Sequence, residues 1–296
     1  MPSSPPASAQ PVLRFAPSPN GRLHLGHALS ALTNERFAQA MGGRLLLRIE
    51  DIDRERCRPA LDTALREDLA WLDIIFDDGI RRQSEHFGDY RAALDDLRQR
   101  GLVYPCFCSR QEVKAAAAAR AAETGEPWPT DPDGAPLYPG TCRGAPAEGD
   151  AVADTTLHVL RLDVERALAV AGEDLRYGLF DEKGAVETVA AQPRRWGDVV
   201  LARKDVPTSY HLSVVVDDAL QGVTHVVRGR DLEAATDIHV LLQRLLGLPT
   251  PLYHFHGLLA DAEGRKLAKS RGSRSLADLR AEGVTAAQIR HDLGFG

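Results

Sequence analysis

Two histidines, His24 and His27, stand where the sequence predicts a strand, a tight turn and then the start of a helix. Residues 12–16 are mostly apolar and predict a buried strand, and a turn rich in proline and glycine follows them. The free N–H groups at a helix N-terminus favour a bound anion such as phosphate. Gly26 would let a nucleotide approach the backbone. The stretch therefore predicts a phosphate-binding turn, with a strand, turn and helix carrying incidental histidines as the alternative.

A second candidate stretch is strongly basic. Residues 265–274, RKLAKSRGSR, hold five basic residues and no acidic one. Lys266 and Lys269 lie three positions apart and could both contact phosphates. A solvated basic loop is the alternative for this stretch taken alone.

Together the two stretches carry a family resemblance. HLGH at 24–27 resembles the HIGH signature of class I aminoacyl-tRNA synthetases, and KLAKS at 266–270 resembles their KMSKS loop. RFAPSP at 14–19 and RIEDID at 48–53 resemble the glutamyl branch of that class. The resemblance extends through most of residues 12–275, and it implies a ligase that activates L-glutamate with ATP and Mg²⁺.

The resemblance also implies roles for the residues of both signatures. Attack of a carboxylate on the α-phosphate of ATP requires mainly positioning and charge stabilisation from the protein. His24, His27 and Lys269 are expected to contact ATP, together with Gly26. The catalytic residues that we expect are His24, His27, Lys266 and Lys269.

Two arginines could bind an acidic amino acid. A buried guanidinium is a natural bidentate partner for a carboxylate. Arg14 ends the first predicted strand and Arg228 ends a later one, so both should point into the crevice where open α/β sheets bind ligands. Structural pairing with Asp51 or Asp231 is the alternative.

Further glutamate contacts are expected around these arginines. Glu50 ends the predicted strand LLLRIE and could accept the substrate ammonium group. The resemblance to glutamyl-tRNA synthetases implies glutamate-binding roles for Arg14, Glu50 and Arg228. It adds Ala16, Ser18 and Tyr210 to the same site.

Three cysteines predict a metal site. Cys106, Cys108 and Cys142 lie within 37 residues, and thiolates are good Zn²⁺ ligands. Chemistry alone leaves the fourth ligand open, because a phenol titrates near ~10 and a histidine such as His158 is the more usual ligand. The CxC…YxxxC pattern resembles the zinc site of short glutamyl-tRNA synthetase paralogues, which implies Tyr138 as the fourth ligand. Ordinary buried cysteines are the alternative.

Composition restricts the class of protein. The chain has 296 residues, 44% of them hydrophobic, and no apolar run approaches the ~20 residues of a membrane span. The N-terminal stretch MPSSPPASAQP lacks the features of a signal peptide, and we expect reduced thiols, with Cys57 simply packed. These features predict a cytoplasmic protein with no membrane partner, and we expect a monomer.

The net charge of −6 is unusual for a protein that binds tRNA, but the distribution of charge matters more than its sum. From Arg265 to the end there are seven basic and three acidic residues. A second basic cluster comprises Arg194, Arg195, Arg203 and Lys204. A solvated basic face is the alternative for each cluster.

Strands alternate with helices along the chain. Residues 59–72 and 89–100 have leucines at helical spacing. The sheet is expected to resume with 212–218 and 224–229, followed by an amphipathic helix that Gly247 ends. The alternation predicts an α/β fold with a Rossmann-type parallel nucleotide-binding sheet.

An Ala-, Pro- and Gly-rich stretch interrupts this pattern. From Cys106 to about Gly149 large apolar residues are few, with one helix expected at 110–123. A strand is expected at 157–162, and Ser275 and Thr285 should cap two short C-terminal helices. The expected organisation is a disordered tail at 1–11, the first half of the nucleotide-binding domain at 12–105, an inserted zinc-binding, acceptor-type subdomain at 106–195, the second half at 196–260, and the KLAKS loop with short helices at 261–296.

The layout narrows the resemblance. Discrete glutamyl-tRNA synthetases continue past KMSKS with an anticodon-binding domain, whereas this sequence ends 26 residues after Ser270. We therefore expect no anticodon-binding domain. This layout, the cysteine pattern and the stretch SVVVDDALQGVTHVVRGRDL resemble the glutamyl-queuosine tRNA(Asp) synthetases. Two features depart from that family: the second histidine of HLGH, and the long spacer between Cys108 and Tyr138.

That resemblance implies the partners L-glutamate, ATP and tRNA(Asp) bearing queuosine. Glutamate would be activated without tRNA and then transferred to the queuosine base at the wobble position. One alternative is the catalytic core of a discrete glutamyl-tRNA synthetase that charges a tRNA 3′ end. Another is a catalytically idle tRNA-binding relic, which the intact set of HLGH, KLAKS, Arg14 and Glu50 disfavours.

Overall fold

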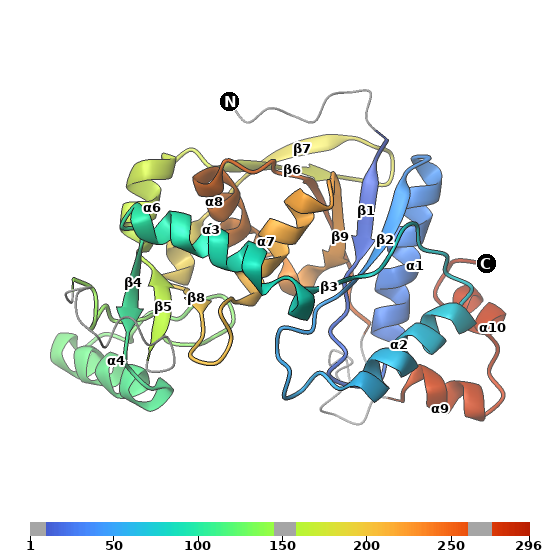
Figure 1. Cartoon of the computed structure of the whole chain (residues 1–296), viewed down its shortest axis with the longest axis horizontal. Coiled ribbons are helices and arrows are strands. Elements are labelled where there is room, and N and C mark those ends of the chain that lie inside the picture. Colours follow the sequence, from blue (N-terminus) through green and yellow to red (C-terminus); the bar gives the residue numbers. More distant parts are fainter. Residues whose placement is uncertain (1–9, 145–157, 260–273) are drawn as a thin grey trace.

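Parallel strands form the centre of the molecule. A computed structural model describes residues 10–144, 158–259 and 274–296 (Figure 1). One group of parallel strands comprises β1 (Val12–Phe15), β2 (Arg44–Ile49) and β3 (Arg81–Arg82), and another includes β9 (His225–Gly229) and β10 (Leu252–His256). The two groups meet at β1, because Thr224 before β9 donates its N–H to the Val12 carbonyl at 2.9 Å. The predicted parallel α/β sheet is therefore confirmed.

Helices cover both faces of these strands. On one face α1 (Leu25–Ala40) packs against β1, β2 and β9, and on the other face α3 (Phe87–Gln99), α7 (Tyr210–Leu220) and α8 (Thr236–Leu246) pack together (Figure 1). Alternate side chains of one strand enter different cores. Val12 and Leu46 join the core with α3, α7 and α8, whereas Leu13 and Leu45 join the core with α1 and α2 (Pro59–Trp71).

The prediction of a strand at 212–218 is wrong. These residues lie in helix α7, whose Leu212, Val214, Val215 and Val216 are all buried. A short apolar run bordered by polar residues fits a buried strand and a buried helix equally well, and β-branched residues favoured the strand. Burial of α7 against α3 and α8 decided the outcome.

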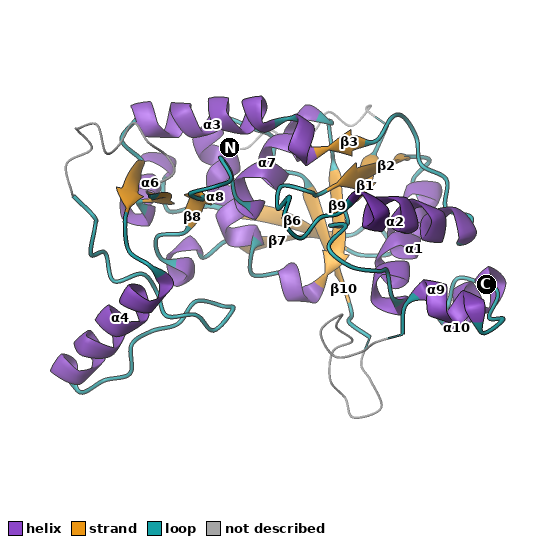
Figure 2. Cartoon of the chain, turned by 60° about the horizontal axis from the view of Figure 1, so that its bottom comes forward, coloured by secondary structure: helices purple, strands orange, loops and turns teal. Residues whose placement is uncertain are grey.

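The part of the molecule that holds the cysteines has its own antiparallel sheet. Its strands are β4 (Val103–Cys106), β5 (Val159–Leu162) and β8 (Val200–Ala202), with α6 (Val164–Ala171) following β5. Helix α4 (Arg110–Thr124) extends away from this sheet (Figure 2). The predicted strand at 157–162 and the predicted helix at 110–123 are thus present.

Strand pairing differs from the predicted insertion at 106–195. β6 (Arg176–Phe180) lies inside that range, yet Leu179 pairs in parallel with Tyr253 of β10, and β7 (Val186–Ala190) pairs with β6. Conversely, β4 begins before the range and β8 follows it. Composition located the Ala- and Pro-rich stretch, but it carries no information on which distant strands pair.

Most predicted helix ends are confirmed. α8 ends at Gly247, which has a left-handed φ of 65°. Ser275 and Thr285 cap α9 (Leu276–Ala281) and α10 (Ala286–Asp292) through their side chains. Short 3-10 turns at Gln83–Glu85, Pro193–Trp196 and Arg230–Leu232 complete the described elements.

The two C-terminal helices pack beside α1 and α2 (Figure 1). Arg290 of α10 donates to the carbonyl of Leu72 at 2.8 Å and to the carboxylate of Glu35 at 2.5 Å. Within the described ranges, the structure contains no helix with the length and apolarity needed to span a bilayer. The KLAKS loop and most of the predicted disordered tail fall outside the described residues.

Candidate active site

A cavity of about 660 Å³ opens at the carboxyl ends of β1 and β9, beside the start of α1. Its lining brings together the residues that the sequence predicted for ATP and glutamate from four separate stretches. The predicted residues around it are Arg14, Ala16, Ser18, His24, Gly26, His27, Glu50, Tyr210 and Arg228. The predicted catalytic lysines Lys266 and Lys269 lie outside the described residues.

The two histidines are held by the first turn of α1. His24 is the N-cap residue, and its Nδ1 accepts from Gly26 N–H at 3.1 Å, while Nδ1 of His27 accepts from His24 N–H at 3.1 Å. Each neutral ring therefore carries its proton on Nε2, a donor of the kind that phosphate oxygens accept. A Cβ atom at Gly26 would lie 2.9 Å from Cε1 of His24. Glycine is thus needed here to keep His24 in place.

Arg14 is paired, but with neither of the two carboxylates that the sequence suggested. Its Nε donates to Oδ1 of Asp218 at 3.0 Å, whereas Asp51 accepts from the backbone and side chain of Ser84. Arg48 donates to the same Oδ1 of Asp218 at 2.7 Å. Burial opposes ionisation of Asp218, but the two guanidinium groups outweigh it and lower the pKa of this carboxyl.

Glu50 lies at the end of β2, as predicted, and is buried. Nη2 of Arg48 donates to its carboxylate at 3.2 Å. Burial raises the pKa of Glu50, and the nearby Arg48 and Arg14 act in the opposite direction. A substrate ammonium group beside Glu50 would favour the ionised carboxylate in the same way as these arginines.

Arg228 has only neutral hydrogen-bond partners. It donates to Oγ1 of Thr236 at 2.6 Å, to the hydroxyl of Tyr210 at 3.4 Å, and to Nδ1 of His239 at 3.3 Å. Among the described residues, no carboxylate lies within ion-pair distance of Arg228, so the predicted alternative of pairing with Asp231 is not observed there. The side chain is only 4% exposed and lines the cavity, where Glu50 and Asp231 also lie but, among the described residues, no carboxylate pairs with it.

His239 in turn contacts a second buried histidine. Nε2 of His239 lies 3.3 Å from Nδ1 of His211. Burial and the charge of Arg228 lower the pKa of His211 to about 4, and they also lower the pKa of His239. Both rings are therefore neutral at neutral pH.

Sequence reasoning missed the residues that hold the two arginines. The helices and strands concerned were predicted from their apolar residues alone, and their polar members Asp218, Arg48, Thr236 and His239 were not singled out. Arg48 is part of the RIEDID stretch, and Asp218 ends the apolar run of α7 next to Asp217. Buried charges at the ends of apolar runs were the available signal, since such groups are rarely buried without partners.

A smaller cavity of about 330 Å³ adjoins the first. The two cavities share Glu50, Ser18 and Tyr210, and the smaller one extends to the residues just before α7. Asp53 within it is paired with Arg56 at 2.6 Å. Polar groups thus surround a second space beside the expected position of glutamate.

The cluster of basic residues predicted at Arg194 and Arg195 is largely paired within the protein. Arg194 lies 2.7 Å from Glu173, and Arg195 lies 2.5 Å from Asp237. The charges of these two residues are therefore offset within the protein, although both side chains remain partly exposed.

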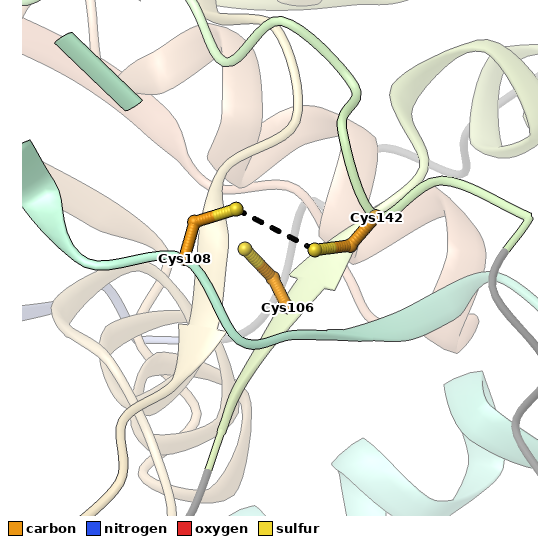
Figure 3. A group of neighbouring side chains, drawn as sticks. All are labelled: Cys106, Cys108 and Cys142. Atoms are coloured by element: carbon orange, nitrogen blue, oxygen red, sulfur yellow. Dashed lines mark hydrogen bonds between the residues drawn. The ribbon is translucent and has the colours of Figure 1, made fainter. Parts of the chain in front are cut away.

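The predicted metal ligands come together in the cysteine-bearing part of the molecule (Figure 3). The Sγ atoms of Cys106, Cys108 and Cys142 all lie within 4.8 Å of one another. The hydroxyl of Tyr138 is 3.3 Å from Sγ of Cys106 and 3.7 Å from Sγ of Cys108. His158 is outside this group and packs against Phe107, with ring centroids 5.3 Å apart.

The spacing of the sulfur atoms suits a tetrahedral metal. Sulfur atoms bound to one Zn²⁺ at about 2.3 Å lie about 3.7 Å apart, and Sγ of Cys108 is 3.5 Å from Sγ of Cys142. Burial raises the pKa of Cys108 to about 11, so its thiolate form needs a nearby cation. The four side chains therefore fit a Zn²⁺ ion.

Comparison with known proteins gives concordant matches. The family model for tRNA synthetases class I (E and Q), catalytic domain, matches residues 11–291. A glutamyl-Q tRNA(Asp) synthetase from Rhodobacter capsulatus is 50% identical over 96% of this chain and 100% of its own. One from Symbiobacterium thermophilum is 40% identical over 95% of this chain and 85% of its own.

Longer ligases match over part of their length. A glutamate–tRNA ligase from Prochlorococcus marinus is 36% identical over 93% of this chain and 56% of its own. The crystal structure of a glutamate tRNA ligase from Elizabethkingia meningosepticum, in complex with its amino acid, superposes with a TM-score of 0.67 and 26% identity. That match covers 89% of this chain and 53% of the ligase, so the chain spans about half the length of these ligases.

The buried histidines predict a loss of stability in acid. His211 stays neutral in the folded protein down to about pH 4, whereas an ordinary histidine protonates below 6.5. The unfolded state therefore binds more protons between these values, and the free energy of unfolding falls as the pH drops from 6.5 towards 4. Asparagine at position 211 keeps an acceptor for His239 but does not titrate.

When the pH is lowered from about 7.5 to about 5, the free energy of unfolding should fall in both proteins, and the fall should be about 2 kcal/mol smaller in His211→Asn than in the unchanged chain. Urea denaturation at both pH values measures this difference. The exposed His291→Asn variant is the matched control and should follow the unchanged chain. Equal losses in His211→Asn and the unchanged chain would contradict the buried neutral state.

Proposed function

The chain belongs to the family of class I tRNA synthetases for glutamate and glutamine, and from this premise we propose that it activates L-glutamate with ATP without needing tRNA. It is a ligase, with an amino acid, ATP and tRNA as partners. We further propose transfer of the glutamate to the queuosine base at the wobble position of tRNA(Asp). The observation that carries the proposal is the single cavity that unites the HLGH turn with Arg14, Glu50 and Arg228.

ATP would occupy the end of the cavity at the start of α1. His24 and His27 supply N–H donors there for the phosphates, and the N-terminus of α1 favours negative charge. The carboxylate of glutamate attacks the α-phosphate, which forms glutamyl-adenylate and releases pyrophosphate. Mg²⁺ would accompany ATP and offset the charge of its phosphates.

Glutamate would lie between the two arginines and Glu50. The charge of Arg14 is already shared with Asp218, whereas Arg228 has only neutral partners. A carboxylate is therefore the favoured partner for Arg228, and an amide in its place would leave a buried cation unpaired. Glu50 would accept the substrate ammonium group.

The accepting nucleotide would enter through the smaller cavity. This space adjoins the glutamate position through Glu50, Ser18 and Tyr210. RNA recognition favours unpaired bases that can extend into such pockets, and an anticodon loop provides them. The hydroxyl groups of the queuosine ring are nucleophiles similar to those of ribose, and the names of the relatives from Rhodobacter capsulatus and Symbiobacterium thermophilum support this acceptor.

The second candidate is an ordinary ligase core that charges the 3′ end of a tRNA. The match to longer glutamate–tRNA ligases favours it, since these share the same catalytic part. A catalytically idle tRNA-binding protein is disfavoured, because the expected ATP and glutamate contacts from Arg14 to Arg228 converge on one cavity.

We also propose a structural Zn²⁺ held by Cys106, Cys108, Tyr138 and Cys142. The support is the convergence of three thiols and one phenol oxygen at the spacing that a tetrahedral ion requires. A bound ion would fix the segment around Tyr138 against β4. It would take no part in the chemistry of the active site.

The first prediction concerns glutamate activation. The protein should catalyse glutamate-dependent ATP–pyrophosphate exchange without tRNA. Arg14→Ala should lower kcat/KM for glutamate by a factor that corresponds to a loss of roughly 2–5 kcal/mol in transition-state stabilisation, because it leaves a buried substrate carboxylate unpaired. The matched control is Arg176→Ala, which removes an exposed arginine paired with Asp174 and should leave exchange unchanged. Absent exchange, or equal exchange with glutamine, would contradict the glutamate assignment.

The second prediction concerns the metal. Purified protein should contain about one Zn²⁺ per chain, and Cys142→Ser should lose most of it. His158→Ala is the matched control and should retain zinc, since His158 lies outside the cluster. Chelation should loosen the cysteine-bearing part while the parallel sheet stays folded, which limited proteolysis can detect. Zinc retained by Cys142→Ser and lost by His158→Ala would show that Tyr138 is the wrong ligand.

The third prediction concerns the acceptor. Labelled glutamate should attach to queuosine-bearing tRNA(Asp), and to its isolated anticodon stem-loop, but not to tRNA(Asp) with unmodified guanosine. Removal of the 3′-terminal adenosine is a cleaner block than periodate, which also attacks the diol of queuosine. If removal of that adenosine abolishes charging while unmodified tRNA is charged normally, the protein is an ordinary ligase core.

A further inference from the structure

We propose that His239 and His211 are positioning residues for the acidic substrate, acting as a hydrogen-bonded pair of uncharged imidazoles that orient Arg228 without neutralising it. This inference rests on the proposed function, in which Arg228 receives a carboxylate of glutamate. It adds a determinant of specificity that does not touch the substrate.

Hydrogen bonding fixes the direction of the pair. A guanidinium has only donors, so Nδ1 of His239, 3.3 Å from Arg228 Nη1, must accept. The proton of His239 is then on Nε2, which lies 3.3 Å from Nδ1 of His211 and donates to it. His211 consequently carries its own proton on Nε2. Each ring therefore has one tautomer that allows the hydrogen bond to its neighbour.

The surroundings of the pair keep both rings uncharged. A protonated His239 would direct an N–H group at the guanidinium of Arg228, and the side chain of His239 is only 1% exposed. The nearest aromatic neighbours are Tyr210 and Trp196, whose rings lie 5.5 Å from the ring of His211. Burial lowers the pKa of His239 most, and the charge of Arg228, the neighbouring His211 and the charges of Arg14 and Arg48 lower it further.

The two substrate arginines differ in a way that gives the pair its role. Arg14 contacts the carboxylate of Asp218, which neutralises much of its charge. Arg228 is equally buried but is held by an imidazole and two hydroxyl groups. An uncharged acceptor satisfies one donor of Arg228 and leaves its charge in need of an anion. The site therefore favours a carboxylate over an amide at this position.

The start of α8 makes this arrangement rigid. Thr236 and His239 lie three positions apart, so both face Arg228. The same turn is braced from outside by the ion pair of Asp237 with Arg195 at 2.5 Å, and by Trp196, whose Nε1 donates to the carbonyl of Ala234. Arg228 is thus held by a fixed surface rather than by a mobile loop.

Glutamate-dependent pyrophosphate exchange with variants of His239 tests the proposal. A glutamine side chain at position 239 can replace both functions of the imidazole, since its Oε1 accepts from Arg228 and its Nε2 donates to His211. A leucine side chain there has a similar size and can do neither. A glutamate side chain at position 239 would neutralise Arg228. The set His239→Gln, His239→Leu and His239→Glu therefore separates hydrogen bonding, packing and charge.

His239→Gln should keep the KM for glutamate within about 3-fold, and His239→Leu should raise it about 10- to 100-fold with the KM for ATP unchanged. His239→Glu should lower the preference for glutamate over glutamine. His211→Phe should also raise the KM for glutamate. Circular dichroism shows whether each variant is folded, and the second variant keeps the test decisive if the first does not fold.

Three results would overturn the positioning role: an unchanged KM for glutamate in His239→Leu, equal impairment in His239→Gln and His239→Leu, or equal increases in the KM values for glutamate and ATP. Absence of exchange in the unchanged chain would instead overturn the proposed function, and the positioning role with it. Normal exchange in the unchanged chain with an unaffected His239→Leu would overturn the positioning role alone.

Discussion

A buried cluster of charges determines the geometry of the candidate active site. Arg48 is 0% exposed and contacts Asp218 at 2.7 Å and Glu50 at 3.2 Å, with Asp217 at 3.9 Å. Separating these buried charges would leave them unpaired at a high cost in free energy, so β2 and the end of α7 are held together. Asp218 also holds Arg14, and Asp217 accepts from Arg81 at 2.7 Å. Arg14 of β1, which we propose to bind the substrate, is therefore fixed by the same ion pairs that join the sheet to α7.

The two ends of the cavity use different physical devices. At the start of α1, backbone N–H groups and the rings of His24 and His27 form the proposed phosphate site, and that end depends on local geometry, as the close approach of Gly26 to His24 shows. At the position proposed for glutamate, the site depends on charge balance: Arg14 is neutralised by Asp218, whereas Arg228 is not neutralised by its partners. An incoming carboxylate completes the pairing of buried groups, so ligand binding also relieves an electrostatic cost of folding.

Immediately around the cysteines the apolar cluster is small and comprises mainly Tyr104, Cys106 and Tyr138, whereas β4, β5 and β8 also contribute side chains to the large core. Polar contacts to buried Asp198 supplement this small cluster, because Asp198 accepts from the hydroxyl of Tyr104 and from Nη2 of Arg143 at 2.7 Å. A metal held by the clustered thiols would supply the cross-links that the small core cannot. The proposed metal would therefore act where the local apolar cluster is smallest.

The sequence by itself determined the parallel α/β fold and most helix boundaries, because these rest on local information such as period and caps. Side chains at strand ends indicated Arg14, Glu50 and Arg228, and resemblance to a known family supplied the other predicted residues of the cavity and the pattern that joins Cys106 with Tyr138. The tertiary structure decided that 212–218 is a helix, that β6 joins β10, and which residues hold the arginines. Arg14 and Asp218 are 204 positions apart, and His239 meets His211 across two helices. Such partners follow from packing and charge balance in the folded chain, and local sequence patterns give no information on either.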